Sequence, residues 1–341
     1  MRPRLIVVGE LNPDIIVTGV PAERGRLRFQ QAEDLVTSMV LTLGSSAAIT
    51  ASAAASAGAD VTLVAVIGDD DLGHTCLRWV CDRGVDVTSV RVVPDVPTGS
   101  SVILVSRDDP GDRQILTHLG AMAELRVDDV TDDLLSSATH VHVASFFMHT
   151  AAREGLHERF AAARMAGATT SLDTNDDPTS EWSGGAHELL AESDVLFCND
   201  REALGLARHA QVQDASGAVD VLLTRLNQGR RRSSDDLHPA VVHKEGEFGA
   251  TVVTHRGRVH VAASAVDVVD TVGAGDTLAG TVLAHLLAGA DWTVALAHGV
   301  AAATLSTTGA GGTGAQPDKE RTQQLAAELA VTDSRSERDN P

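Results

Sequence analysis

The sequence is poor in lysine and in long apolar runs, and each shortage excludes a class of protein. Among its 341 residues the only lysines are Lys244 and Lys319, and the formal net charge is −20. Such a chain lacks the basic face that nucleic-acid phosphates require, so we expect no nucleic-acid partner. No apolar run approaches the roughly 20 residues of a membrane-spanning helix. The apolar stretch near the N-terminus is also too short for a signal peptide, so we expect a cytoplasmic protein without membrane contact.

Cysteine is scarce as well. Cys76, Cys81 and Cys198 form no recognisable disulfide or metal-binding framework, and they fit structural thiols in a reducing compartment. One basic cluster, GRRRSSDD at 229–236, is followed at once by aspartates, which predicts a solvated loop.

Apolar, β-branched runs alternate with helix-like patterns along most of the chain. The runs typical of buried strands are RLIVVGEL at 4–11, DVTLVAVIGDD at 60–70, THVHVASFF at 139–147, TTSLDTN at 169–175 and SDVLFCND at 193–200. Helical patterns lie at 45–59, 73–84 and 151–167. This alternation predicts an α/β fold, a three-layer αβα core around a mainly parallel sheet. Ligands of such sheets bind at the carboxyl ends of the strands.

Two segments break the alternation. DIIVTGVPAERGRLRF at 14–29 and VPTGSSVILVSRDDPGDRQILTHLG at 96–120 have alternating side chains and turn residues, which is typical of hairpins. We expect them to form a small β-sheet lid, from about 14–34 and 95–118, over a single domain of residues 1–330. The polar tail 331–341 is expected to be disordered.

The stretch VVDTVGAGDTLAG at 268–280 carries the strongest chemical signal. It follows a strand-like run at 259–268 and opens a helix-like one, so Gly273, Ala274 and Gly275 present backbone amides at a helix N-terminus. Asp276 lies beside this anion cradle and suits a base that takes a proton from an attacking hydroxyl. A cradle with an adjacent base indicates phosphoryl transfer to an alcohol. The alternative is a glycine turn in which Asp276 only caps the helix.

Other glycine-rich motifs are excluded. Neither lysine follows a glycine, as the P-loop requires, and no G-x-S-x-G elbow is present. The match to G-x-G-x-x-G, GAGGTG at 309–314, follows a helical pattern rather than a strand, so it does not predict a dinucleotide site.

Five stretches together resemble the ribokinase-like (PfkB-type) carbohydrate kinase family, in the family's order from about residue 5 to about residue 330. They are the 268–280 loop, LGSSAAITASAAASAGADVTLVAVIGDDDLG at 43–73, CNDREALGL at 198–206, KEGEFGA at 244–250 and AHGVAAATLSTTGAGGTGAQP at 297–317. The resemblance implies an ATP-dependent kinase that uses Mg²⁺ and phosphorylates a hydroxyl of a small sugar or sugar acid.

The resemblance also implies roles for residues on the nucleotide side. Asp276 would be the catalytic base, and Gly273–Gly275 would form the anion hole. Asn199 and the metal-side residue Glu202 would organise phosphates and Mg²⁺, partly through water. Nucleotide contacts would come from Lys244, Gly246, Gly249, Thr271 and His298. Asp270 matches a position that binds a monovalent cation such as K⁺ in many members, with a turn-capping aspartate as the alternative.

On the acceptor side, the resemblance assigns sugar hydroxyls to Asn12 and Asp14, with Gly44 and Ser45 close by. Amide and carboxylate groups suit adjacent hydroxyls because each can serve two of them. Arg113 and Thr117 are candidates to reach the substrate from the lid, and the lids would allow a homodimer.

Two departures and two alternatives stay open. Ala48 stands where the family usually has an asparagine, and the family's double glycine is Leu43-Gly44 here, which leaves the sugar undetermined. A nucleoside kinase of the same fold differs only in its acceptor pocket. A non-catalytic sugar or nucleotide sensor would lack the base, and the presence of Asp276 argues against it.

Overall fold

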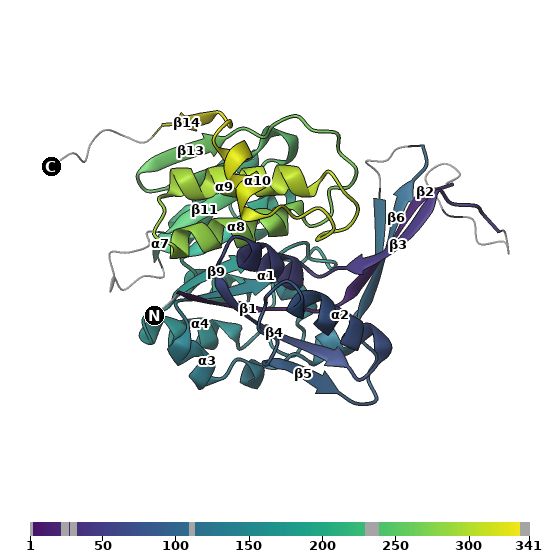
Figure 1. Ribbon diagram of the computed structural model, residues 1–341. Coiled ribbons are helices and arrows are strands. Elements are labelled where there is room, and N and C mark those ends of the chain that lie inside the picture. Colours follow the sequence, from purple (N-terminus) through teal and green to yellow (C-terminus); the bar gives the residue numbers. More distant parts are fainter. Residues whose placement is uncertain (1–2, 22–26, 28–32, 109–112, 229–238, 335–341) are drawn as a thin grey trace.

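In the described part of the chain, ten strands form one large sheet and four form a smaller one (Figure 1). The computed structural model describes residues 3–21, 27, 33–108, 113–228 and 239–334. The large sheet has the order β14-β13-β12-β11-β10-β9-β8-β1-β4-β5. Its strands are β1 (Arg4–Val8), β4 (Asp60–Gly68), β5 (Val90–Val93), β8 (His140–Ala144), β9 (Thr169–Asp173), β10 (Val195–Asn199), β11 (Ala240–Lys244), β12 (Ala250–Thr254), β13 (Gly257–Val261) and β14 (Val331–Asp333).

The large sheet is parallel from β11 to β5 and antiparallel from β11 to β14. The inner parallel strands β1, β4, β8, β10 and β11 are buried on both faces. The prediction of a mainly parallel sheet is confirmed. The antiparallel edge was not predicted from the sequence.

Helices cover both faces of this sheet (Figure 1). One layer consists of α1 (Ser46–Ser56), α2 (Asp71–Cys81), α8 (Ala274–Leu287), α9 (Trp292–Ser306) and α10 (Lys319–Ala326). The other consists of α3 (Asp132–Ser137), α4 (Leu156–Met165), α5 (Ala186–Ala191), α6 (Asp200–Leu206) and α7 (Ala215–Gln228). Two apolar clusters, one on each side of the sheet, hold the layers together. The predicted three-layer αβα core is confirmed.

The smaller sheet is the lid, which projects from the large sheet at the right of Figure 1. Its order is β3-β2-β6-β7, and its strands are β2 (Pro13–Val20), β3 (Ser38–Leu43), β6 (Ser100–Ser106) and β7 (Arg113–His118). The antiparallel pair β6–β7 agrees with the hairpin predicted at 96–120, whose DDPGD turn lies largely outside the described residues.

The first lid hairpin was predicted too early in the chain. Strand β2 pairs with β3, which lies beyond the predicted window of 14–34. Strand β3 has apolar side chains on both faces, with Met39 and Leu41 on one and Val40 on the other. It therefore lacks the period-2 alternation by which a half-buried strand is recognised.

Two other sequence predictions are corrected by the fold. Residues Val331–Asp333 pair with β13 as a strand because the open edge of the sheet offers backbone partners, so the tail is ordered there. Strand β13 ends at Val261, and a long loop rather than a strand leads into Gly273. The cluster at 229–236 and the residues 335–341 lie outside the described residues.

Helices α1 and α8 cross in very close contact. A β-carbon on Gly280 of α8 would lie 2.2 Å from the carbonyl oxygen of Thr50 in α1, which only glycine avoids. The Thr50 hydroxyl also donates to the carbonyl of Asp276 at 3.3 Å. The first turns of the two helices are therefore held in a fixed relation.

Candidate functional site

A cleft of about 940 Å³ opens where the lid faces the carboxyl ends of the large sheet. Residues from the ends of β1 and β8, from α1 and from the lid line one half, which we call the acceptor half. They include Glu10, Asn12, Asp14, Ser45, Ser101, Ile103, Thr117, Met122, Ser145, Met148 and Asn175. Residues from β10, β11 and α9 line the other, the donor half, and include Asn199, Glu202, Lys244, Gly246, Gly249, Val300, Ala303, Thr304 and Thr307.

The loop that begins α8 separates the two halves. Gly273 has φ +73°, and a β-carbon there would lie 2.8 Å from Cα of Gly312, so this turn requires glycine. The first intrahelical bond runs from the Thr277 amide to the Gly273 carbonyl at 2.8 Å. The amides of Gly275 and Asp276 precede it and have no acceptor within the helix. Since these donors lie at the positive end of the helix dipole, they form an anion cradle.

Asp276 lies in the first turn of α8 and lines the cleft, although the residue is only 8% exposed. The side-chain amide of Asn175 donates to its Oδ1 at 3.4 Å. Burial raises the pKa of Asp276 to about 7, and the nearby carboxylate of Asp173 adds to the rise, whereas Lys244 opposes it. A carboxylate with this pKa can accept a proton near neutral pH.

Lys244, at the end of β11, places its ammonium beside the cradle. Its Nζ lies 2.7 Å from Oδ2 of Asp173 and 3.3 Å from Oε2 of Glu202. Its side chain also runs along Gly275, where a β-carbon would lie 3.1 Å from Cδ. Burial works to lower the pKa of Lys244, but Asp173 and Glu202 outweigh burial and hold the pKa above its usual range. The cradle therefore has a permanent positive charge next to it.

Asn199 and Glu202 form a capping box at the start of α6. The Glu202 amide donates to Oδ1 of Asn199 at 3.0 Å, and the Asn199 amide donates to Oε2 of Glu202 at 2.8 Å. Burial raises the pKa of Glu202, against the effect of Lys244. The pair thus has a structural task in addition to its place in the cleft.

The acceptor half is built on the end of β1 and the start of α1. Asp14 is 6% exposed, and the side-chain amide of Asn12 lies 3.4 Å from its Oδ1. A β-carbon on Gly44 would fall 2.1 Å from that oxygen, so Gly44 is needed to admit the carboxylate. Burial raises the pKa of Asp14 to about 7, with contributions from Glu10 and Asp276.

Sequence reasoning missed Glu10. Its Oε1 accepts hydrogen bonds from the Ser46 amide and the Ser145 hydroxyl, both at 2.7 Å. The Ser45 hydroxyl donates to the Glu10 carbonyl, which ties α1 to the end of β1. The signal was available, because Glu10 follows the first strand directly, two residues before Asn12.

The lid contributes one row of side chains over the acceptor half. Asp14, Ser101 and Thr117 lie side by side across three lid strands, and the Ser101 and Thr117 hydroxyls are 3.1 Å apart. Arg113 lies farther along β7, and its Nη1 donates to the Thr271 hydroxyl at 3.2 Å. Arg113 therefore reaches the loop before the cradle.

Two predicted site residues lie elsewhere. His298 stacks on His285, with ring centroids 4.0 Å apart, and is not among the residues that line the cleft. On α9 it lies two positions from Val300, which rotates it away from the face that lines the cleft. Asp270 uses both carboxylate oxygens to accept from the amides of Val272 and Gly311, each at 2.9 Å. This favours the turn-capping alternative.

The turn between β11 and β12 carries the predicted glycine pair. Gly246 has φ +60° and Gly249 has φ +103°, and both line the donor half. A β-carbon on Gly249 would lie 2.0 Å from the Val261 carbonyl, so this close approach of two backbones excludes any side chain.

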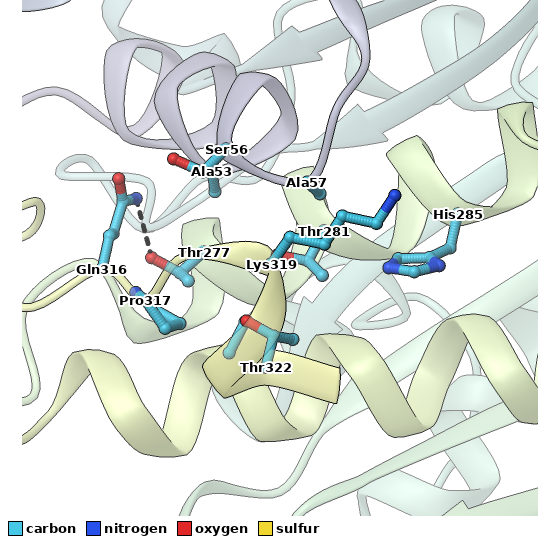
Figure 2. A pocket seen from close by; sticks show the side chains of 11 residues that line it. Ala53, Ser56, Ala57, Thr277, Thr281, His285, Gln316, Pro317, Lys319 and Thr322 are labelled. Atoms are coloured by element: carbon cyan, nitrogen blue, oxygen red, sulfur yellow. Dashed lines mark hydrogen bonds between the residues drawn. The ribbon is translucent and has the colours of Figure 1, made fainter. Parts of the chain in front are cut away.

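A second, much smaller pocket lies behind the base, between α1, α8 and α10 (Figure 2). Its volume of about 10 Å³ is enough for a single water molecule. The side-chain amide of Gln316 donates to the Thr277 hydroxyl at 3.0 Å and fixes the residue after Asp276. Lys319 lies at this pocket and not at the cleft.

Among the described residues, no set of three His, Cys, Asp or Glu side chains is arranged so that it could hold a metal ion. None of the described helices has both the length and the apolar character that crossing a membrane requires.

Comparisons with known proteins show the family of the chain. The family model "pfkB family carbohydrate kinase" matches residues 2–319. The chain is 31% identical to an ATP-dependent ribose-1-phosphate kinase of Halopiger xanaduensis, over 89% of this chain and 91% of the relative. It is also 31% identical to a 2-dehydro-3-deoxygluconokinase of Thermoproteus tenax, over 81% and 83%.

Solved structures show the same fold. A putative ribokinase II from E. coli, in complex with ATP and Mg²⁺, has a TM-score of 0.79 at 20% identity and covers 96% of this chain and 99% of its own. The ribokinase of Arabidopsis thaliana, complexed with ribose and ATP, has a TM-score of 0.75 at 23% identity, with coverages of 96% and 99%. The chain belongs to the pfkB family of carbohydrate kinases.

Proposed function

We propose that the protein transfers the γ-phosphoryl group of ATP to a hydroxyl of a small sugar or sugar acid, with Asp276 as the general base. The observation that carries this proposal is the position of Asp276, which is buried beside the amide cradle, between the two halves of one cleft. A base at this point contacts both a hydroxyl bound below the lid and a phosphate bound at α8.

The proposed step uses groups already present in the chain. Asn12 and Asp14 hold the acceptor, and the Asp276 carboxylate takes the proton of the attacking hydroxyl. A bond forms between the acceptor oxygen and the γ-phosphorus as the bond to the oxygen of ADP breaks. The amides of Gly275 and Asp276 stabilise charge on the transferring group. The lid excludes water, so that phosphate is not lost to hydrolysis.

The donor half fits a nucleotide with Mg²⁺. Glu202 and Asn199 both carry side-chain oxygens of the kind that Mg²⁺ binds, and the two side chains are hydrogen-bonded to each other. This arrangement suits an ion that keeps part of its water shell and takes its other ligands from the phosphates. When bound, Mg²⁺ offsets phosphate charge. The glycine turn of Gly246 and Gly249 gives backbone access to the nucleotide.

Two further parts of the proposal concern K⁺ and oligomerisation. If K⁺ binds near Asp270, turnover falls when Na⁺ replaces K⁺.

The outer face of the lid exposes Met39, Leu41 and Leu116, and we propose that a second copy of the chain covers this face. Sedimentation of the wild type and of Leu41→Lys tests this pairing. We expect a dimeric wild type and a monomeric variant, and a monomeric wild type contradicts the pairing.

A nucleoside kinase is the second candidate. Ile103, Ile115, Met122 and Met148 give the acceptor half an apolar wall beside its polar groups. Such a wall suits the base of a nucleoside as well as a sugar ring.

The test is a coupled assay of ADP release over pentoses, hexoses, keto-deoxy acids and nucleosides, run beside the Asp276→Asn variant. We expect at least one acceptor to raise ADP release in the wild type and none to do so in the variant. A fully active variant, or no response to any acceptor, contradicts the proposal.

A further inference from the structure

The acceptor half of the cleft has an uneven charge. Glu10 and Asp14 lie in it, and Asp276 lies at its inner boundary. The Asp14 carboxyl is influenced by the charges of both other groups. Among the described residues that line the cleft, the basic side chains are Arg113 and Lys244. The position of these two cations decides what charge a bound acceptor meets.

Glu10 has one carboxylate oxygen, Oε2, that is buried without a hydrogen-bond partner within the described part of the chain, so the residue acts on the cleft through its charge and not through this atom. The residue is 5% exposed. The nearest basic group is His149, whose Nε2 lies 3.6 Å from Oε2. Burial lowers the pKa of His149, and its Nε2 also contacts the carbonyl of Ala144 at 3.0 Å. The Glu10 charge is therefore not balanced by a strong cation.

Asp14 is held in a similar way. The distance from the Asn12 side-chain amide to Oδ1 of Asp14 is long, at 3.4 Å. Gly44, which packs against the Asp14 carboxylate, has no side chain that could donate to it. Ser101 and Thr117, its neighbours across the lid, have hydroxyls that bond to each other. Such groups can serve as partners for hydroxyls but cannot neutralise an anion.

The two cations make their hydrogen bonds outside the acceptor half, although Arg113 itself lies on lid strand β7. Lys244 is paired with Asp173 and Glu202 beside Gly275. Arg113 donates to Thr271, two residues before the cradle. Both cations are therefore held by partners at the cradle side of the cleft, and neither is bonded to Glu10 or Asp14.

We propose that the acceptor is a polyhydroxylated molecule without a phosphate or carboxylate group, and that Glu10 and Asp14 discriminate against anionic acceptors. This inference rests on the proposed function and narrows it. An anionic acceptor would lie among like charges in a partly dry site, where repulsion is weakly screened. The chain would thus differ from its relatives named as kinases of ribose 1-phosphate and 2-dehydro-3-deoxygluconate, whose substrates carry a phosphate and a carboxylate.

The first experiment compares matched acceptors in the wild-type enzyme. Ribose is paired with ribose 1-phosphate, and sorbitol with gluconate, within a panel of neutral sugars, amino sugars, nucleosides, sugar acids and sugar phosphates. We expect every acceptor with high kcat/KM to lack an anionic group. Calorimetric binding of the same pairs is measured in parallel. If ribose 1-phosphate or any sugar acid binds more tightly or reacts faster than its neutral partner, the inference is wrong, even though the kinase activity stands.

The second experiment changes the charge alone. In Glu10→Gln, the ratio of kcat/KM for anionic over neutral acceptors should rise at least about tenfold, because one close like charge is removed. Asp14→Asn should shift the ratio in the same direction. Glu158→Gln, on the exposed side of α4, is the matched control and should leave the ratio unchanged. An unchanged ratio in both cleft variants overturns the proposal, as does loss of anionic turnover in Arg113→Gln.

Discussion

The side chain of Lys244 lies against Gly275, where a β-carbon would fall 3.5 Å from Nζ. Both residues line the cleft, and the Lys244 side chain is 11% exposed. Among the described residues, its partners are Asp173 and Glu202, which take two of the three N–H donors of the ammonium. One N–H donor therefore remains for a ligand. The lysine therefore joins the strand ends of the donor half to the amide cradle.

We expect Lys244→Met to reduce kcat by about 100-fold, since removing one donor from a preorganised anion site has an effect of this size. The ratio of the dissociation constants for ADP and a non-hydrolysable ATP analogue should also fall, because the γ-phosphate loses a partner. Lys319→Met removes the chain's other lysine from the far side of α8 and should leave both quantities unchanged.

The same substitution leaves two buried carboxylates unpaired, so stability must be separated from catalysis. The double variant Lys244→Met, Asp173→Asn should recover much of the lost stability without recovering turnover. Recovered turnover would mean that Lys244 only holds the fold together.

For Asp276→Asn we expect turnover to fall by at least about 1000-fold, at the upper end of what general-base catalysis contributes. The substitution keeps the shape and size of the side chain, so the affinity for ADP, measured by calorimetry, should change little. Wild-type turnover in this variant would leave Asp276 with only a capping role.

The pH dependence follows from the pKa of Asp276, which is raised to about 7. The base acts as a carboxylate, so kcat/KM should rise with pH up to about 7 and then level off. Asp14 has a similar pKa, and Asp14→Asn is the control that separates them. The inflection should persist in this variant, and its disappearance would assign it to Asp14 instead.

The free energy of unfolding should change with pH in the opposite direction to kcat/KM. A folded-state pKa of about 7 against a model value of 3.8 means that the folded protein binds more protons than the unfolded chain between these pH values. The free energy of unfolding therefore falls as pH rises from about 4 to about 7. Asp276→Asn should raise it at pH 8 by roughly 2–4 kcal/mol, as measured by urea titration. Asp82→Asn, at an exposed position, should not.

Gly280→Ala tests the contact between α1 and α8. The new methyl would overlap the Thr50 carbonyl, and we expect a loss of roughly 2–4 kcal/mol in the free energy of unfolding. Gly217→Ala in α7 meets only ordinary contacts and should be neutral or slightly stabilising. Equal effects in urea denaturation of the two variants would show that the crossing is not tight.

The centre of the parallel core was predictable because β1, β4, β8 and β10 are buried runs rich in apolar residues, whereas β5 and β11 were not predicted. The 268–280 loop was predictable because its glycines and Asp276 are adjacent in sequence. Lys244 differs, because its partners Asp173 and Glu202 come from other segments of the chain and meet it only after the sheet has formed. The position of His298 could not be predicted, because the sequence pattern predicts a helix but not the rotation of that helix about its axis. The face of α9 that lines the cleft therefore stayed unknown.

The crossing of α1 and α8 sets the distance over which a phosphoryl group would travel. The first turn of α1 borders the acceptor half of the cleft, and the first turn of α8 holds the cradle. Gly280 and Thr50 lock the two helices into one rigid body, so neither turn can shift without the other. The lid strands lie outside this body. The kind of molecule received can therefore diverge among related enzymes while the reaction geometry stays constant.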